Sequence, residues 1–391
     1  MNLRHRPHPR HAGEPTALVL STQYRSGPWC VRALRDAGFR TIGAERTGHT
    51  PGQGRSMACP NPVRYPSPAT RPTAFLEWLE DICAQQGVDV VLPNSEDAVR
   101  VIAHGAPNLS GAVVAGPDAP QYIALCDKAG LAASAQAVGA GHPATVVVTD
   151  PGGHPALPSA PVIVKAALSG ESLKEDLGTV LAHSDADRDD AVAHMLAAGS
   201  PALVQEFVTG VPWVVHGVRT RSGRLVVVAA RVATTYPRTV GVSSISTSVP
   251  CPPRLLEDTR RLLSHVAYVG PFCTNAIERD GAFFTHDINL RVAASVGLAV
   301  SAGLDVPGLG ARAALGQQVD FPDERREVTY LRLDGEARAL MDAIHGGGDV
   351  RSVLGDGLAA LPGHRVLDPN PFDPLFMGIT TGRALRKALR R

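Results

Sequence analysis

The sequence FCTNAIERDGAFFTHDINLR, residues 272–291, decides the fold. Its two runs of apolar and β-branched residues, 272–277 and 283–289, flank the turn residues Arg279-Asp280-Gly281, and this pattern predicts a β-hairpin. A second hairpin of the same kind is predicted over 213–230. Helical patterns lie between these strands. A sheet of antiparallel hairpins backed by helices is typical of an α+β lobe.

The end of the first hairpin carries three polar side chains spaced two residues apart. Asp287, Asn289 and Arg291 project from one face if the segment is a strand. A carboxylate, an amide oxygen and a guanidinium on one face suit a polyphosphate bound with Mg²⁺. Hard oxygens ligate Mg²⁺, and arginine neutralises phosphoryl oxygens. The hairpin therefore predicts a site for a magnesium-bound polyphosphate, although an ordinary exposed polar face has the same pattern.

The turn decides whether Asn275 joins this face, because residues paired directly across an antiparallel ladder share a face. With 280–281 alone as the loop, residue 275 faces His286 and points to the wrong side. With 279–281 as the loop and Gly281 left-handed, residue 275 lies on the side of Asp287. The cluster therefore requires the three-residue loop. By the same parity Glu278 is expected to point away from it or to lie at the turn, and His286 is expected on the opposite face of the strand.

Two lysines and one short motif are further candidates for contact with a nucleotide. Lys128 follows Asp127, and Lys165 ends the apolar strand predicted at 162–166. A lysine at a strand end can deliver a point charge to a phosphate. The alternating residues Gln205-Glu206-Phe207-Val208 close another predicted strand and could offer backbone groups and an apolar surface to a base. Each of these features alone is also compatible with an ordinary strand or a solvent-facing lysine.

Length, composition and charge exclude several classes of protein. The chain has 391 residues, 44% of them hydrophobic, which suits two or more lobes because single cores stop growing at about 250–300 residues. With 38 Lys and Arg against 37 Asp and Glu, it has no broad electrostatic footprint for nucleic acid. No apolar run is long enough to span a membrane, and the six cysteines lack metal-ligand spacing. A cytoplasmic protein that binds small molecules, not nucleic acid or membrane, is expected.

The N-terminal part alternates apolar strand patterns with helical ones, which predicts an open parallel sheet. The predicted strands are 17–20, 39–44, 88–92 and 113–115, and the predicted helices are 29–37 and 75–86. Ligands bind beyond the carboxyl ends of such strands, which directs attention to 21–27 and 93–97. The first loop lacks the glycine fingerprint of a dinucleotide site, so a dehydrogenase is not favoured. Residues 1–15, rich in arginine, histidine and proline, predict a disordered tail.

A second arginine-bearing stretch follows the strand predicted at 224–230. Arg231 and Arg238 flank Thr234-Thr235-Tyr236-Pro237, and small hydroxyl residues follow over 241–248. This stretch predicts either a plain surface loop or a substrate loop with arginines that meet anions.

The order of these features resembles the ATP-grasp superfamily and, within it, the carboxylate–amine ligases. The matching motifs are Asp127-Lys128, Val164-Lys165, Gln205-Glu206-Phe207-Val208 and Asp287-Ile288-Asn289-Leu290-Arg291, followed by 299–316 with its GLDVP and by Asp368-Pro369-Asn370-Pro371 ahead of a basic segment, 383–391. Each motif alone is weak, but their shared order over about residues 16–316 is hard to produce by chance.

The resemblance implies an N-terminal open parallel-sheet domain and two α+β lobes that clamp ATP. The implied boundaries are a tail at 1–15, the N-terminal domain at 16–125, the central lobe at 126–202, the C-terminal lobe with the metal site at 203–320, and a C-terminal extension at 321–391. The small-residue loop at 168–173, with Ser169 and Gly170, would cover the nucleotide.

The resemblance also implies a role for each candidate residue. Lys128 and Lys165 would contact the phosphates, and Lys165 would also assist catalysis. The adenine would be lined by Gln205, Glu206, Phe207 and Val208, with Glu206 accepting from the amino group. Mg²⁺ would be held by Asp287, Asn289 and Asn275. Arg291 and, by position, Arg231 would meet the γ-phosphate or the acyl phosphate.

Three positions depart from the family pattern. Asn275 stands where a carboxylate is usual, which would lower metal affinity, and Asp287 is the shorter acid where glutamate is common. Pro212 falls where an acidic ribose contact often occurs, so the ribose contact stays unassigned. Residues 150–161 form a shortened loop where relatives often carry a helix.

The implied activity is an ATP-dependent ligation of a carboxylate to an amine through an acyl phosphate, with release of ADP and phosphate. Two alternatives stay open: an ATP-grasp enzyme that forms carboxyphosphate, and a non-catalytic ATP-binding regulatory protein, which Asn275 and Pro212 keep in consideration. The expected partners are a small carboxylate and a small amine, neither of which the sequence identifies. The oligomeric state is open, and the homodimer is the commonest assembly.

Overall fold

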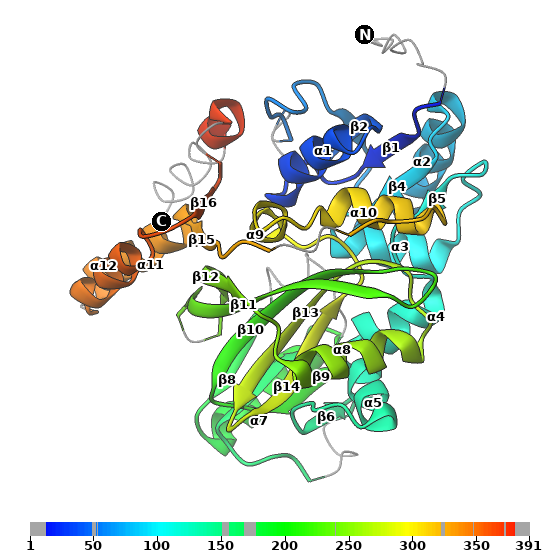
Figure 1. Ribbon diagram of the computed structural model, residues 1–391. Coiled ribbons are helices and arrows are strands. Elements are labelled where there is room, and N and C mark those ends of the chain that lie inside the picture. Colours follow the sequence, from blue (N-terminus) through cyan, green and yellow to red (C-terminus); the bar gives the residue numbers. More distant parts are fainter. Residues whose placement is uncertain are drawn as a thin grey trace.

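The computed structural model describes residues 13–48, 52, 54–150, 156–167, 177–238, 240–321, 325–346, 348–370 and 373–379. It contains one parallel and two largely antiparallel sheets with their helices (Figure 1), which confirms the predicted fold class. Most of the predicted tail at 1–15, the residues Ser169 and Gly170, and the terminal basic segment 383–391 lie outside the described residues.

The N-terminal lobe is a five-stranded parallel sheet in the order β3-β2-β1-β4-β5. Its elements are β1 (Thr16–Val19), α1 (Ser26–Asp36), β2 (Arg40–Arg46), β3 (Val63–Tyr65), α2 (Pro72–Gln86), β4 (Val90–Leu92), α3 (Glu96–Gly105), β5 (Val113–Val114), α4 (Ala119–Gln121) and the π-helical turn η1 (Tyr122–Cys126). Successive residues of β1 enter different cores: Leu18 packs with Phe75 of α2, and Val19 packs with Leu34 of α1. Burial on both faces explains why this strand is a continuous apolar run.

The central lobe is an antiparallel sheet in the order β6-β9-β7-β8. Its elements are α5 (Lys128–Val138), β6 (Thr145–Val148), β7 (Val162–Ala166), β8 (Thr179–Ala182), α7 (Asp185–Ala197) and β9 (Ala202–Glu206). Helix α7 begins at a capping box formed by Ser184 and Asp187 and buries Met195 against the sheet. The predicted lobe boundary at 202/203 falls inside β9 and is corrected to a point after Glu206.

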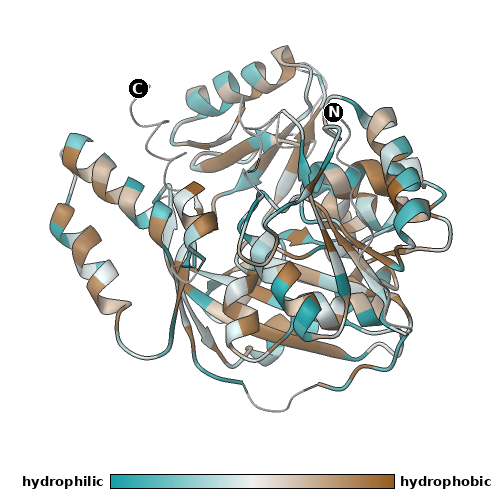
Figure 2. Cartoon of the chain, turned by 90° about the horizontal axis from the view of Figure 1, so that it is seen from above, coloured by the Kyte–Doolittle hydropathy of each residue, from teal (hydrophilic) through white to brown (hydrophobic). Residues whose placement is uncertain are grey.

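The C-terminal lobe is a seven-stranded sheet in the order β14-β13-β10-β11-β12-β15-β16. Its elements are β10 (Val211–Arg219), β11 (Leu225–Tyr236), β12 (Val242–Val249), α8 (Pro253–His265), β13 (Gly270–Arg279), β14 (Ala282–Asn289), α9 (Val296–Ser301), α10 (Val306–Ala314), β15 (Thr329–Arg332), α11 (Leu333–Gly346), α12 (Val350–Ala359) and β16 (Arg365–Asp368). The predicted loop at 231–248 is wrong, because β11 and β12 occupy most of it. The predicted extension supplies β15, β16 and the hairpin α11–α12, which stands away from the body in two views (Figures 1 and 2).

The two faces of this sheet have different neighbours. Trp213 and Val215 face a core shared with Leu262 of α8, which we call the outer face. Val214 and Ala230 face a core shared with α9, α10 and the N-terminal lobe, which we call the inner face. Because adjacent residues of a strand alternate between faces, the register of each strand decides which side chains reach the inner face.

Two broader expectations can be compared with the described residues. All six cysteines are free thiols, and four of them are buried, in keeping with their scattered spacing. In the described part of the chain, every helix is too short or too polar to cross a membrane.

The first turn of α1 packs closely on the loop that precedes it, and this contact predicts a specific stability effect. A Cβ on Gly27 would lie 2.5 Å from the backbone oxygen of Thr22, so Gly27→Ala should destabilise the protein by about 1–3 kcal/mol. Among the described residues, no atom lies within 4 Å of a Cβ added to Gly378, in the helical segment 374–379, so Gly378→Ala should be neutral or stabilising by up to about 1 kcal/mol. Urea unfolding of both variants checks this, and equal effects would contradict it.

Candidate functional site

The hairpin formed by β13 and β14 has a shorter loop than the sequence analysis requires. Arg279 pairs with Ala282, so only Asp280 and Gly281 lie between the strands. Both have positive φ, 53° and 77°, as a two-residue type I′ turn demands. The predicted three-residue loop is therefore wrong.

A β-bulge restores the predicted cluster by a different route. Ala276 pairs with Thr285, whereas Asn275 pairs with Asp287, so His286 is an extra residue on β14. The register shifts by one at this point, and Asn275 and Asp287 lie directly opposite each other. They occupy the inner face, because Asn275 also pairs with Val214. The bulge therefore places the amide and the carboxylate together despite the short loop.

The cluster is a connected chain of hydrogen bonds. Asp287 Oδ2 accepts from Asn275 Nδ2 at 3.1 Å and from Asn289 Nδ2 at 2.7 Å. Arg291 Nη2 donates to Asn289 Oδ1 at 3.0 Å. All four side chains are half-buried, so a ligand can reach them while the strands hold their backbones.

The donor set fits Mg²⁺ only together with an anionic ligand. The cluster holds one carboxylate and two amides, and the described residues contain no group of three His, Cys, Asp or Glu side chains suited to a metal. Rotating each amide would present its oxygen in place of its NH₂ group. Mg²⁺ prefers six oxygens and usually keeps phosphate oxygens and water among them. Asp287, Asn289 and Asn275 could therefore hold an ion whose remaining ligands come from a triphosphate.

Lys165 faces a polar group of the central lobe. Its Nζ donates to Gln205 Oε1 at 3.2 Å, and Gln205 Nε2 donates to Thr145 Oγ1 at 2.9 Å. Lys165 and Gln205 share a face of the four-stranded sheet because Lys165 pairs with Leu203, two residues before Gln205. The two candidates from separate motifs thus lie side by side.

The charges of Asp287 and Lys165 both act on His286, the bulged residue of β14. Burial and the charge of Lys165 lower its pKa to about 4, while the charge of Asp287 opposes that shift. Burial also lowers the pKa of His142 to about 4, and the charge of Lys165 adds to this. A bulge leaves no compositional signal, so the strand pattern alone could not reveal that residue 286 is the extra one.

Glu206 links the central lobe to the hairpin. Its Oε1 lies 3.0 Å from Arg279 Nη1, and Arg279 also stacks over the ring of Phe284. Val208, two residues after Glu206, is buried. The motif at 205–208 therefore leads from the central lobe to the C-terminal lobe.

Lys128 is the first residue of α5, a helix that contacts β14. Asp127 caps this helix by accepting from the backbone N–H groups of Ala129 and Gly130. Just before it, Cys126 packs against the core that contains Leu290, the residue between Asn289 and Arg291. The start of α5 is therefore fixed against the end of β14.

The register removes Arg231 from this cluster. Ala230 pairs with Val214, the residue that pairs with Asn275, so Ala230 is on the inner face. Arg231 follows it and pairs with Trp213 on the outer face. The predicted phosphate contact of Arg231 is therefore not supported, because its side chain starts on the opposite side of the sheet.

Two predicted ligand loops of the N-terminal lobe meet at the point where the strand order reverses. β1 and β4 are neighbours, and Ser21 Oγ donates to Ser95 Oγ at 2.9 Å. Ser21 has a positive φ of 62°, a strained conformation for a residue other than glycine. A Cβ on Gly116, just after β5, would lie 3.8 Å from the backbone oxygen of Leu290. These loops therefore open next to the end of β14.

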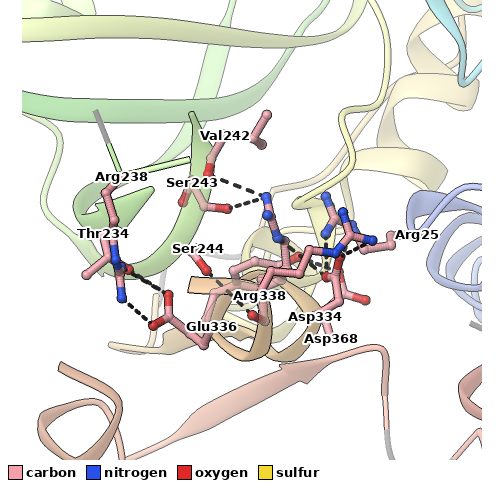
Figure 3. Close-up of polar contacts among 12 residues, drawn as sticks. Arg25, Thr234, Arg238, Val242, Ser243, Ser244, Asp334, Glu336, Arg338 and Asp368 are labelled. Atoms are coloured by element: carbon pink, nitrogen blue, oxygen red, sulfur yellow. Dashed lines mark hydrogen bonds and ion pairs between the residues drawn. The ribbon is translucent and has the colours of Figure 1, made fainter. Parts of the chain in front are cut away.

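A partly buried ionic network, which the sequence did not reveal, joins this lobe to the start of α11 (Figure 3). Arg25 Nη1 donates to Asp334 Oδ1 at 3.1 Å, and its Nε lies 3.7 Å from Asp368 Oδ2. Arg332 is only 5% exposed, and its Nε lies 3.4 Å from the same Asp334 oxygen. Burial, and then the charge of Arg25, lower the pKa of Arg332. The sequence feature that could have indicated this network is Arg332, a charged residue at the end of the apolar strand Thr329–Arg332.

The same end of α11 holds the turn between β11 and β12. Arg238 Nη2 donates to Glu336 Oε2 at 2.8 Å, and Thr234 Oγ1 donates to Glu336 Oε1 at 2.9 Å (Figure 3). Arg238 is therefore engaged with a carboxylate within the protein. The arginine that was expected to meet a substrate anion instead ties the strand turn to α11.

His216 supports the segment that follows the cluster. It lies on the inner face, pairing with Cys273, which in turn pairs with Asn289. Its Nε2 is 3.0 Å from Ser295 Oγ, four residues after Arg291. The ring is fully buried, and burial lowers its pKa to about 4. A neutral His216 therefore fixes the loop that leads away from Arg291.

Comparison with known proteins places this arrangement in one fold. No protein-family model matches the chain, and no curated protein matches it by sequence. Several solved structures are similar. An L-amino acid ligase from Bacillus licheniformis matches with a TM-score of 0.63 and 14% identity, over 77% of this chain and 74% of that one. The ADP complex of purK, N5-carboxyaminoimidazole ribonucleotide synthetase, matches with a TM-score of 0.63 and 14% identity over 85% of each chain, and biotin carboxylase from Campylobacter jejuni with a TM-score of 0.61 and 13% identity over 78% of this chain and 72% of that one. The chain has the ATP-grasp fold.

The neutral, buried His216 predicts a pH-dependent stability. The unfolded chain binds a proton at His216 below about pH 6.5, whereas the folded protein does so only near pH 4. The folded state thus loses about 1.4 kcal/mol per pH unit in this window as the pH falls. His216→Gln removes that loss, so its destabilising effect should be about 2 kcal/mol smaller at pH 5 than at pH 7. Urea unfolding at both pH values measures this, and an unchanged effect would refute a neutral His216.

Proposed function

We propose that the protein is an ATP-dependent ligase that joins a small carboxylate to a small amine. One observation supports the proposal most strongly. The β-bulge in β14 brings Asn275, Asp287, Asn289 and Arg291 into one series of hydrogen bonds, beside the segments that join the lobes. Metal-type oxygens stand at one end of this series and a guanidinium at the other. Such an arrangement suits the transfer of a phosphoryl group to a carboxylate.

In this proposal ATP lies between the central and C-terminal lobes. Residues 205–208 would line the adenine, with Gln205 and Lys165 already in contact. Lys165 and Lys128 would bind the phosphates. Mg²⁺, held by Asp287, Asn289 and Asn275, would neutralise charge on the triphosphate. Ser169 and Gly170, expected to cover the nucleotide, remain part of the proposal.

The carboxylate would bind at the end of β14, beside the N-terminal loops at 21–27 and 93–97. A carboxylate resists attack by an amine because its anion is resonance-stabilised, so it first needs a leaving group. Its oxygen attacks the γ-phosphorus, the bond to the β-phosphate oxygen breaks, and ADP leaves. Arg291, which is hydrogen-bonded to Asn289, would bind the equatorial oxygens of the transferring group.

The second step forms the amide. A neutral amine attacks the acyl carbon, the carbon–oxygen bond to phosphate breaks, and inorganic phosphate leaves. The amine gives up one proton overall, to solvent or to phosphate. The chain's contribution here is to hold the two reactants together and to exclude water.

The proposal predicts which reactants the protein needs. With Mg²⁺ and ATP, wild-type protein should release ADP and phosphate only when a carboxylate and an amine are both present, and an amide should appear by mass spectrometry. Asp287→Ala should lower the rate at least about 100-fold, because the one acidic ligand is lost. Arg291→Ala should lower kcat more than it raises KM, because its contact forms in the transition state.

Two control variants come from the same sheet. Asp280→Asn changes a carboxylate at the tip of the hairpin, where asparagine tolerates the positive φ. Arg231→Ala removes an arginine from the outer face. Both should keep wild-type turnover. Loss of activity in Arg231→Ala would show that this residue belongs to the site.

Other outcomes would favour the alternative functions. ADP release with bicarbonate alone would favour carboxyphosphate chemistry. ATP binding without turnover across a broad substrate panel would favour a regulatory binder.

A further inference from the structure

The C-terminal motif Asp368-Pro369-Asn370 has no part in the proposed reaction, although it begins beside the loop between β1 and α1. Asp368 ends β16, pairs with Arg332 of β15 and is only 1% exposed. Its Oδ2 accepts a hydrogen bond from the hydroxyl of Tyr330 and lies 3.7 Å from Nε of Arg25. A buried carboxylate is costly unless a positive partner faces it, so Asp368 and Arg25 depend on each other.

Arg25 directly precedes α1, and its guanidinium is held on two sides (Figure 3). Its Nη1 donates to Asp334 Oδ1 at 3.1 Å, while its Nε faces Asp368. Asp334 Oδ1 in turn lies 3.4 Å from Nε of the buried Arg332. A guanidinium is a planar group whose donors point in fixed directions. The two carboxylates therefore fix the direction of the Arg25 side chain and, with it, the end of the loop that it belongs to.

The other end of this loop, residues 21–27, is fixed to the N-terminal sheet. Ser21 has a positive φ of 62°, and its Oγ donates to Ser95 Oγ at 2.9 Å. The same Oγ lies 2.7 Å from the hydroxyl oxygen of Tyr65. A residue other than glycine keeps such a backbone conformation only where its surroundings impose it. The loop is therefore a short bridge with one anchor at Ser21, in its own lobe, and a second at Arg25, supplied by the C-terminal part of the chain.

A second carboxylate holds the same helix farther from the loop. Asp373 is fully buried, and its Oδ1 accepts from the backbone N–H groups of Met57 and Phe376. Its Oδ2 lies 3.5 Å from Nη2 of Arg32. Arg32 follows Arg25 by seven residues, or about two helical turns, so both arginines lie on one side of α1. Asp373 thus holds the middle of α1, whereas the motif holds its start.

We propose that Asp368 is a positioning residue for the carboxylate substrate, because through Arg25 it fixes the loop 21–27 in the orientation that binds this substrate. The inference rests on the proposed function, in which the carboxylate lies beside this loop and ATP lies between the other two lobes. A displaced loop weakens the carboxylate site and leaves the ATP site unchanged. Asp373 holds α1 about two turns away from the loop and has no such effect.

A double-mutant cycle in the KM of the carboxylate tests whether Asp368 acts through Arg25. Asp368→Asn and Arg25→Gln should each raise this KM about tenfold and change the KM of ATP less than about twofold. The double variant should also show a rise of about tenfold, instead of about 100-fold, because the second substitution removes a contact that is already lost.

The matched control is Asp373→Asn, which keeps the acceptor for both backbone N–H groups and removes only the charge beside Arg32. Both KM values should stay at the wild-type level in this variant. An unchanged carboxylate KM in Asp368→Asn, multiplied effects in the double variant, or an equal rise in both KM values would overturn the proposal.

Hydrogen exchange measured by mass spectrometry separates this role from the proposed reaction. The backbone amides of Tyr24 and Gly27 donate to carbonyl oxygens within the loop at 3.0 and 2.9 Å, so they report its order. Asp368→Asn should speed exchange in a peptide that spans 21–27, and Asp373→Asn should not. If the wild-type protein has no ligase turnover, the proposed function fails, and this exchange alone decides whether Asp368 fixes the loop.

A substitution at a more exposed side chain covers the case in which Asp368→Asn does not fold. Arg25 is 21% exposed and Arg32 is 35% exposed, both at the side chain. Arg25→Gln should speed exchange in the loop 21–27, whereas Arg32→Gln, on the same side of α1, should leave it unchanged. Equal exchange of the loop in wild type and Arg25→Gln would overturn the proposal.

Discussion

One inserted residue sets the face on which the candidate chemistry lies. The two-residue turn at Asp280 and Gly281 would turn Asn275 away from Asp287. The bulge at His286 shifts the register by one, and the side-chain period of two then brings amide and carboxylate to the same face. Without that shift the hairpin would divide its polar groups between the inner face and the core on α8.

The three lobes are then arranged around the end of this hairpin. The ion pair of Glu206 with Arg279 joins the central lobe to it, and Cys126, just before α5, packs against the core that contains Leu290. The N-terminal sheet brings its two loops to the same end, because its strand order reverses between β1 and β4. On another side, Arg25 and the buried Arg332 form ion pairs with Asp334 at the start of α11. The fold thus brings several weak local motifs together at the end of the β13–β14 hairpin.

The spacing of apolar residues and the turn residues predict the local elements of this structure, its strands and hairpins. The continuous apolar run of β1, the strand Val162–Ala166 and both hairpins follow from period and turn residues. The bulge was not predictable, because a strand with one extra residue has no distinct composition. The side of Arg231 depends on register across three strands. The meeting of Arg25 with Asp334, 309 positions apart, depends on tertiary packing alone. Fold and hairpin residues were therefore within reach of the sequence, and long-range partners were not.

The most direct test of the account is where a metal binds. Crystals grown with ADP and Mn²⁺, measured at the manganese absorption edge, would locate the ion by its anomalous signal. The proposed site predicts an anomalous peak coordinated by the carboxylate of Asp287, the amide oxygen of Asn289 and phosphate oxygens. It also predicts that His286 is the unpaired residue of the β-bulge in β14. A peak held by the nucleotide alone, or a hairpin without the bulge, would contradict it.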